Sequence, residues 1–200
     1  KEITLDLAGN MGLIAKRCFP NATQVIDRFH VHQLASEALQ EIRIKHRWEA
    51  LEAENNAIER AKHDKTSFVP ELLENGDTLK QLLARSRYLL YKSEHNWSAE
   101  QEQRARILFA RYPDIEKAYQ LTQKLSWIFN HTKDKIYAFT RLAKCHEKVE
   151  QAGFKSFNTL SRTIVNHHKT ILNYFDNHST NASAESFNAK IKAFRAQYRG

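Results

Sequence analysis

Residues 3–32 read ITLDLAGNMGLIAKRCFPNATQVIDRFHVH, and this stretch decides how the N-terminal part of the chain folds. Its two short apolar runs are Ile3–Leu7 and Thr23–Ile26. Between them, apolar side chains recur at helical spacing, at Met11, Ile14 and Cys18. The pattern predicts a strand, a helix and a second strand. Because the connection is long enough for a crossover, we expect the two strands to pair in parallel.

Each apolar run ends on an aspartate, Asp6 in the first and Asp27 in the second. In a parallel pair, both would lie at the carboxyl edge of the sheet, where open α/β sheets bind ligands and metals. With His30 close behind Asp27, these residues form a candidate site for metal or phosphate chemistry. The alternative is structural, because an aspartate at the end of a strand often caps the helix or turn that follows.

The composition favours a folded, basic protein. Of its 200 residues, 42% are hydrophobic, which is enough for one domain or for one domain with a large insertion. Lys and Arg number 31 against 23 Asp and Glu, and the resulting net charge of +8 favours a polyanionic partner. Residues 151–200 contain seven Lys or Arg against only Asp176 and Glu185, so the C-terminal quarter favours nucleic acid.

The cysteines and the apolar runs indicate a cytoplasmic location. Cys18 and Cys145 form neither a CxxC pair nor a disulfide framework, which favours a reducing compartment. We find no run long enough to span a membrane and no signal peptide. Because the chain starts at Lys1 almost directly on a strand and stops at Gly200 just past a helix, we expect both ends to be cuts inside a longer protein.

Helical patterns cover most of the remaining sequence. Ser98 and Gln101 have capping-box spacing, Pro113 fits a first helical turn, Thr132 can cap a further helix and Gly153 can end it. The predicted helical stretches are 31–62, 72–83, 98–109, 113–128, 132–153, 160–175 and 179–197. We predict no strand between residues 31 and 175, and therefore a fold that is mainly α with a small α/β part.

The last predicted helix has two distinct faces. Phe187, Ile191 and Phe194 would face a core. A second stripe combines an acid, an amide and two cations, at Glu185, Asn188, Lys192 and Arg195. A metal-binding carboxylate beside groups that hold phosphate oxygens would have this pattern. A solvated helix face is the alternative, because acids near the start and cations near the end favour the helix dipole.

Taken together, these segments resemble the DDE transposases of bacterial insertion sequences, specifically the ISL-three family. The resemblance spans essentially all 200 residues, and its specific parts are the DRFHV box and STNASAESFNAKIKAFR. It implies an RNase H-like fold interrupted by an all-helical insertion. The implied division is an RNase H-like strand-helix-strand segment at 1–30, the insertion at 31–175 and a returning helix at 176–200.

The resemblance also assigns roles to single residues. Asp6 matches the second metal-binding acid and Glu185 the third, and these two would be catalytic. Asp27 and His30 match a D-x-x-H element that supports the acids, and Asn188 belongs to the same supporting group. The first acid would lie on an earlier strand that this sequence does not contain, so we expect the 200 residues to be an inactive fragment of a catalytic domain.

Cofactors and partners follow from the same resemblance. Two Mg²⁺ or Mn²⁺ ions would be held by the carboxylates, because hard cations prefer oxygen ligands. Double-stranded DNA, as transposon ends and target, would be the partner, and no membrane would be involved. Phosphate contacts would come from the cations beside Glu185, namely Lys190, Lys192, Arg195 and Arg199. The full-length protein could be a homo-oligomer, acting in the bacterial cytoplasm at the nucleoid.

Several alternatives stay open. The chain could be a non-catalytic basic module that binds DNA or assists assembly, or a helical interaction protein without a nucleic-acid role. Trp97 or Trp127 could stack on a flipped base, although helical tryptophans usually pack in a core. The SRYLL stretch, with basic residues at Arg85, Arg87 and Lys92, could contact DNA or form a solvated turn.

Overall fold

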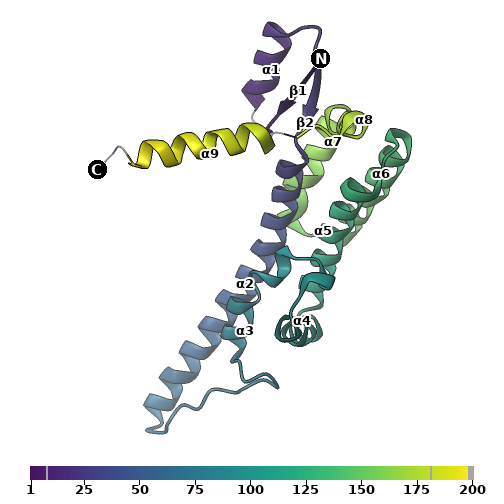
Figure 1. Ribbon diagram of the computed structural model, residues 1–200. Coiled ribbons are helices and arrows are strands. Elements are labelled where there is room, and N and C mark those ends of the chain that lie inside the picture. The colour runs from purple at the N-terminus through teal and green to yellow at the C-terminus, as the bar shows by residue number, and fades with distance from the viewer. Residues whose placement is uncertain (8, 181, 198–200) are drawn as a thin grey trace. The chain divides into compact units, whose positions relative to one another are not determined.

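The computed structural model describes residues 1–7, 9–180 and 182–197, and confirms a mainly helical fold with a small parallel sheet. Figure 1 shows the elements along the chain. In order they are β1 (Glu2–Leu5), α1 (Gly9–Cys18), β2 (Thr23–Ile26), α2 (Arg28–His63), α3 (Leu79–Arg85), η1 (Leu89–Tyr91), η2 (Glu94–Asn96), α4 (Ala99–Arg111), α5 (Pro113–His131), α6 (Lys135–Ala152), η3 (Lys155–Phe157), α7 (Asn158–Leu172), α8 (Tyr174–Asn177) and α9 (Ala182–Gln197). None of these helices, over the residues described, has the length and apolar character needed to cross a membrane.

The chain packs into two compact units. Unit 1 comprises residues 1–34, 125–147 and 159–200, and unit 2 comprises residues 35–124 and 148–158. Helices α2, α5 and α6 each contribute residues to both units. Unit 1 therefore combines the strand pair with helical residues distant in sequence, whereas unit 2 is helical over its described elements.

The strand-helix-strand prediction is confirmed. β1 and β2 pair in parallel, with Leu5 opposite Ile26, and α1 makes the crossover between them. Leu5, Val25 and Ile26 are buried, and because Val25 and Ile26 are consecutive and point to opposite faces, both faces of the sheet are covered at the end of β2. The apolar side chains whose spacing predicted α1 do not lie in a core, because Met11, Ile14 and Cys18 are all exposed.

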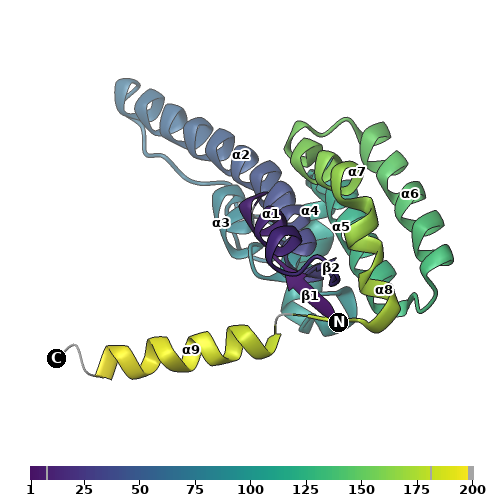
Figure 2. The ribbon, with the colours of Figure 1, turned by 90° about the horizontal axis from the view of Figure 1, so that it is seen from above.

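Aromatic packing forms the core of unit 1. The ring of Phe129 on α5 stacks on Phe175 with centroids 5.4 Å apart, and Tyr174 meets Phe129 edge-on at 5.5 Å. Such offset and edge-on ring pairs add attraction beyond the area they bury. Helices α6 and α7 lie side by side (Figure 2), and Ser161 Oγ on α7 lies 2.8 Å from His146 Nε2 on α6. The chain after residue 125 thus builds the helical support of unit 1.

Local capping signals in unit 2 are also confirmed. Ser98 and Gln101 form the capping box that starts α4, and α5 begins at Pro113. Trp97 packs against the rings of Phe109 and Tyr119, and its indole Nε1 donates to the carbonyl of Leu89 at 2.8 Å. Trp97 is therefore a packing residue, because its polar group already has a partner inside the unit.

Two helix starts differ from the sequence prediction. The stretch from Leu72 is not helical until Leu79, because Gly76 takes a left-handed turn (φ +76°) and Thr78 forms a capping box with Gln81. At the start of α6, the cap is Asp134, whose carboxylate accepts from the backbone N–H groups of residues 136 and 137. The predicted cap Thr132 instead accepts a hydrogen bond from Arg141.

Asp77 is the electrostatic centre of unit 2. Its side chain is 1% exposed and accepts from Arg85, and from Arg104 Nε at 3.2 Å. Asn75 Nδ2 donates to the same carboxylate at 2.9 Å. A buried carboxylate with these partners joins the start of α3 to α4, and its loss would leave Arg104 without a charge partner in a largely buried place.

We predict that Asp77→Ala lowers the free energy of unfolding by about 3 kcal/mol, the cost typical of breaking a buried ion pair. The matched control is Glu74→Ala, which breaks the exposed pair with Arg106 and should cost less than about 1 kcal/mol. Urea unfolding followed by tryptophan fluorescence measures both. Equal losses in the two variants would contradict a central role for Asp77.

Candidate functional site

The two strand-end aspartates follow neighbouring strands. Asp6 comes directly after β1 and Asp27 directly after β2, and the backbone N–H of Asp27 donates to the carbonyl of Leu5 at 2.9 Å. Because the strands are parallel and in register, both acids follow the same edge of the sheet. The expectation that they share this edge is confirmed, and it defines the candidate site in unit 1.

Asp27 acts as a helix cap in this structure. Its side chain is buried, and Oδ1 accepts the backbone N–H of Phe29 at 2.9 Å, in the first turn of α2. Its carbonyl oxygen accepts the N–H of His30 at 3.2 Å. The capping alternative is therefore realised, and an oxygen committed to a helix N-terminus favours a positioning role over direct metal ligation.

Arg28, the first residue of α2, attaches the start of this helix to α5 and α8. Its guanidinium donates to Asn130 Oδ1 at 2.7 Å, although the two residues are 102 positions apart. The same group lies 5.8 Å from the centre of the Tyr174 ring. Sequence reasoning missed Arg28, and its position directly after Asp27 in the DRFH box was the available signal. The strand end thus sits on a helix start held by α5 and α8.

The two histidines of the box differ in their surroundings. His30 is half-buried, and its ring meets Phe29 edge-on at 5.6 Å. His32 packs beside Phe129, with ring centroids 5.2 Å apart. Burial, assisted by the charge of Arg28, lowers the pKa of His32 from 6.5 to about 4, while Asp27 acts in the opposite direction. His32 is therefore a neutral packing residue near pH 7.

The C-terminal segment returns to the first strand. Asn177 Nδ2 donates to Glu2 Oε1 at 2.7 Å, and the hydroxyl of Ser179 donates to Glu2 Oε2. These two hydrogen bonds, first from Ser179 and then from Asn177, lower the pKa of the Glu2 carboxyl. Asn173 Nδ2 also donates to the carbonyl of Gln24 in β2 at 2.9 Å. The residues that precede α9 are thereby attached to both strands.

Helix α9 carries the remaining predicted site residues. Lys190, Lys192 and Arg195 are exposed, as phosphate contacts require. The side chains of Glu185 and Asn188, and the whole of Arg199, lie outside the described part of the structure, as do the predicted core side chains of Phe187 and Phe194. The convergence of Glu185 on Asp6 therefore stays a prediction.

The described residues set limits on metal chemistry. Among them, no group of three or more His, Cys, Asp or Glu side chains could hold a metal ion. The predicted donor set consists of carboxylates, which suit Mg²⁺ or Mn²⁺ rather than zinc. Of its members, Asp6 is half-buried at the strand edge and Glu185 belongs to α9. The described side chains alone therefore do not complete the predicted metal site at this edge.

A comparison with protein families gives one result. The model of the family DDE_Tnp_ISL3, described as transposase, matches residues 1–200. No curated protein and no solved structure gives a significant match. The family match covers the strand pair, both helical units and the residues of α9.

We predict that Asp27→Ala lowers the free energy of unfolding by about 1–2 kcal/mol, because α2 loses its capping acceptor. Asp27→Asn keeps a side-chain oxygen at the same position and should lose much less. Chemical denaturation measures the difference between the variants. Equal destabilisation by both substitutions would show that the negative charge, and not the cap, is what the fold needs.

We also predict that stability falls as the pH drops from about 6.5 to about 4. His32 is neutral when folded, so the unfolded chain binds the extra proton in this range, and protonation favours unfolding by up to about 3 kcal/mol. Denaturation at several pH values should show a shallower dependence for His32→Leu than for the parent chain. His63→Leu, at an exposed position, is the control and should keep the parent slope. Parallel curves for all three proteins would contradict the prediction.

Proposed function

Because the chain belongs to this transposase family, we propose that unit 1 forms part of a metal-dependent centre for DNA strand cleavage and transfer, with Asp6 and Glu185 as metal-binding carboxylates. The observation that carries the proposal is the return of the chain to β1. Asn177 and Ser179 both bind Glu2, so the segment that leads into Glu185 starts on the strand that leads into Asp6.

Chain lengths support the convergence of the two acids. From Glu2 to Asp6, four strand steps cover about 13 Å. From Ser179 to Glu185, three extended steps and three helical ones cover up to about 15 Å. The two paths leave the same anchor and have similar maximum lengths, so the carboxylates can meet if the paths run in the same direction.

The proposed fold follows from these connections. The parallel strand pair at 1–30 and the helix after residue 176 would form the RNase H-like part, and residues 31–175 would be the helical insertion between the two acids. A parallel pair with a helical crossover is a unit that such a fold can contain. The attachment of Asn173 to β2 and of Asn177 to β1 supports the view that the chain comes back to the sheet after the insertion.

The proposed chemistry divides between the metal and the protein. Two Mg²⁺ or Mn²⁺ ions, when bound, would activate a hydroxyl nucleophile and stabilise the leaving oxygen of a phosphodiester. Asp6 and Glu185 would hold the ions, and the family's motif matches only these two of three acids within the 200 residues. Asp27 would position the strand end through its cap on α2, and His30 and Asn188 would be further supporting residues.

DNA is the partner expected of a transposase. Carboxylates alone would repel its backbone, so cations beside the site are needed. We propose that Lys190, Lys192 and Arg195 on α9 contact phosphates together with Arg199, giving a salt-dependent affinity for transposon ends and target. These exposed cations also suit a non-catalytic DNA-binding module, which is the second candidate function.

We predict that the chain binds Mn²⁺ and that Asp6→Asn or Glu185→Gln weakens binding at least about tenfold, because a carboxylate ligand loses its charge. The matched control is Asp176→Asn, which removes a unit 1 acid paired with Lys135 and should bind as the parent does. Titration followed by Mn²⁺ electron paramagnetic resonance measures the free ion. Parent-like Mn²⁺ binding by all three variants would contradict the catalytic proposal and favour the non-catalytic module.

We further predict that the 200-residue chain does not nick supercoiled DNA in Mg²⁺, because two matched acids cannot complete a site that needs three. Gel analysis of plasmid DNA over hours tests this. Nicking that disappears in Asp6→Asn would show that the acid set is complete within these residues.

A further inference from the structure

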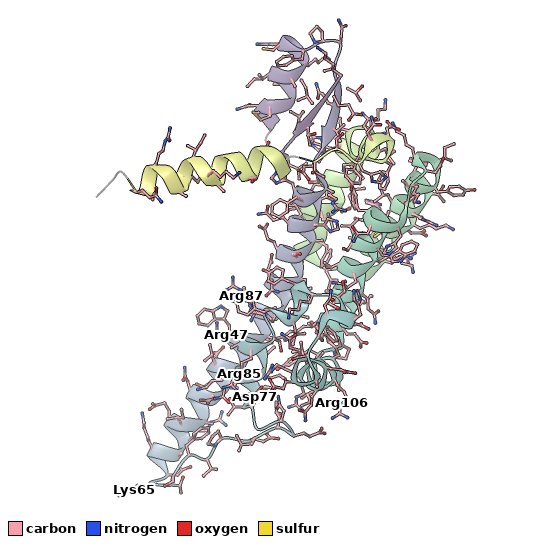
Figure 3. The ribbon with its side chains drawn as sticks, viewed as in Figure 1. Arg47, Lys65, Asp77, Arg85, Arg87 and Arg106 are labelled. Carbon is pink, nitrogen blue, oxygen red and sulfur yellow. The ribbon has the colours of Figure 1, made fainter. Side chains whose placement is uncertain are left out.

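Unit 2 exposes large side chains on one face of α2 and on the segment after α3. Trp48 is 66% exposed and Tyr88 is 68% exposed. Arg47 and Arg87 are exposed beside them in sequence, and Figure 3 shows both arginines on the same side of α2. We call Arg47, Trp48, Arg87 and Tyr88 the Trp48 patch. Exposed aromatic rings that are grouped with cations on one surface can mark an interaction site.

Hydrogen bonds hold the two parts of the patch together. Gln40 Nε2 donates to the carbonyl of Arg87 at 3.2 Å, and Arg43 donates to the carbonyl of Leu83 at 2.7 Å. Arg43 Nε also donates to Gln40 Oε1 at 2.6 Å. The segment that carries Arg87 and Tyr88 is therefore fixed against α2 one or two turns before Arg47 and Trp48.

The charge of this region is not neutralised within the described part of the chain. Arg43 is buried, and the acceptors of its hydrogen bonds are the neutral oxygens of Gln40 and Leu83. Arg47 and Arg87 likewise form no ion pair with a described carboxylate. Burial is the main cause that lowers the pKa of Arg43, and the charges of Arg47 and Arg87 lower it further, whereas Tyr91 acts in the opposite direction.

Other arginines in unit 2, unlike those of the Trp48 patch, form ion pairs with carboxylates. Arg85 and Arg104 both bind the buried Asp77, and Arg106 pairs with Glu74. The three arginines of the patch region thus combine mutual repulsion with one buried charge, an arrangement that a bound anion would relieve. The expected ligand is polyanionic, because two exposed arginines on separate elements can contact successive phosphates of one strand.

The exposed aromatic rings indicate which kind of polyanion the patch would bind. Arg87 lies 5.5 Å from the centre of the Tyr88 ring, so a cation and a ring are presented together. Trp48 has no ring partner among the described residues, unlike Trp97, which packs inside the unit, and Trp127, which stacks on His131. Free aromatic faces beside cations are typical of surfaces that bind single strands, where bases stack and phosphates meet arginines.

We propose that the Trp48 patch binds an unpaired DNA strand, with Arg47 and Arg87 on successive phosphates and Trp48 and Tyr88 stacking on bases. The inference rests on the proposed function for its choice of DNA as the partner. It uses neither the acids nor the metal, and all of its residues belong to unit 2.

Binding of a labelled oligothymidylate of about 15 nucleotides, a length that covers common single-strand sites, tests the proposal by fluorescence anisotropy. The 200-residue chain is used in a buffer with EDTA, so that bound metal ions do not contribute to the measured affinity. We expect Arg47→Ala/Arg87→Ala to bind at least about tenfold more weakly, and the slope of log affinity against log salt to fall by about 1.4. We expect Trp48→Ala to lose about five- to a hundredfold for the single strand and clearly less for a duplex of matching length.

The matched control is Lys65→Ala/Arg106→Ala, which changes the charge by the same amount at positions away from the patch (Figure 3). It should reduce affinity by much less than Arg47→Ala/Arg87→Ala. Equal losses in the two double variants would overturn the proposal, as would unchanged single-strand binding by Trp48→Ala. Displacement of the oligonucleotide by polyglutamate of equal charge at equal concentration would also overturn it, because stacking would then contribute nothing. The readout in EDTA uses neither metal binding nor strand cleavage, so failure of this proposal and failure of the catalytic proposal are distinguishable.

Discussion

The parallel pairing of β1 and β2 is the constraint on which the rest of unit 1 depends. Two strands alone are not stable in water, so this pair needs cover from elsewhere in the chain. The cover comes from residues far away in sequence, because Asn173 binds the backbone of Gln24 and Asn177 binds Glu2. The contacts that stabilise the sheet also hold the residues that precede α9 beside it, so under the proposed function one set of contacts would serve both the stability of unit 1 and the site.

The buried Asp27 shows how a motif can serve the fold and the site together. Its backbone N–H extends the pairing to Leu5, and its carboxylate caps α2 through Phe29. A residue that closes a strand and opens a helix fixes the direction of the chain at the sheet edge. Asp6, on the neighbouring strand, gains a rigid neighbour from this arrangement. The DRFH box therefore has a structural reason to follow the second strand, whatever further role His30 has.

Local patterns in the sequence were sufficient for most of the elements. Alternation and helical spacing predicted the strands and crossover, and the Ser98 capping box predicted the start of α4, because these signals act over a few residues. The prediction of a helix from Leu72 was wrong, because the chain makes a left-handed turn at Gly76 and the helix begins only after that turn. The pairing of Arg28 with Asn130 could not be predicted, because no local pattern reports a contact across 102 positions.

Net charge was a weaker guide to function than the pairing of charges. The sequence total of +8 does not separate cations that stabilise the fold from cations available to a partner. In unit 2, Arg85 and Arg104 share the carboxylate of Asp77, whereas Arg43, Arg47 and Arg87 form no ion pair with a described carboxylate. Because a neighbouring carboxylate offsets part of the field of a cation, the cations of the second group are the more available to an anionic partner. Its position beside exposed aromatic rings is the reason we propose this region, and not the basic composition as a whole, as the interaction surface.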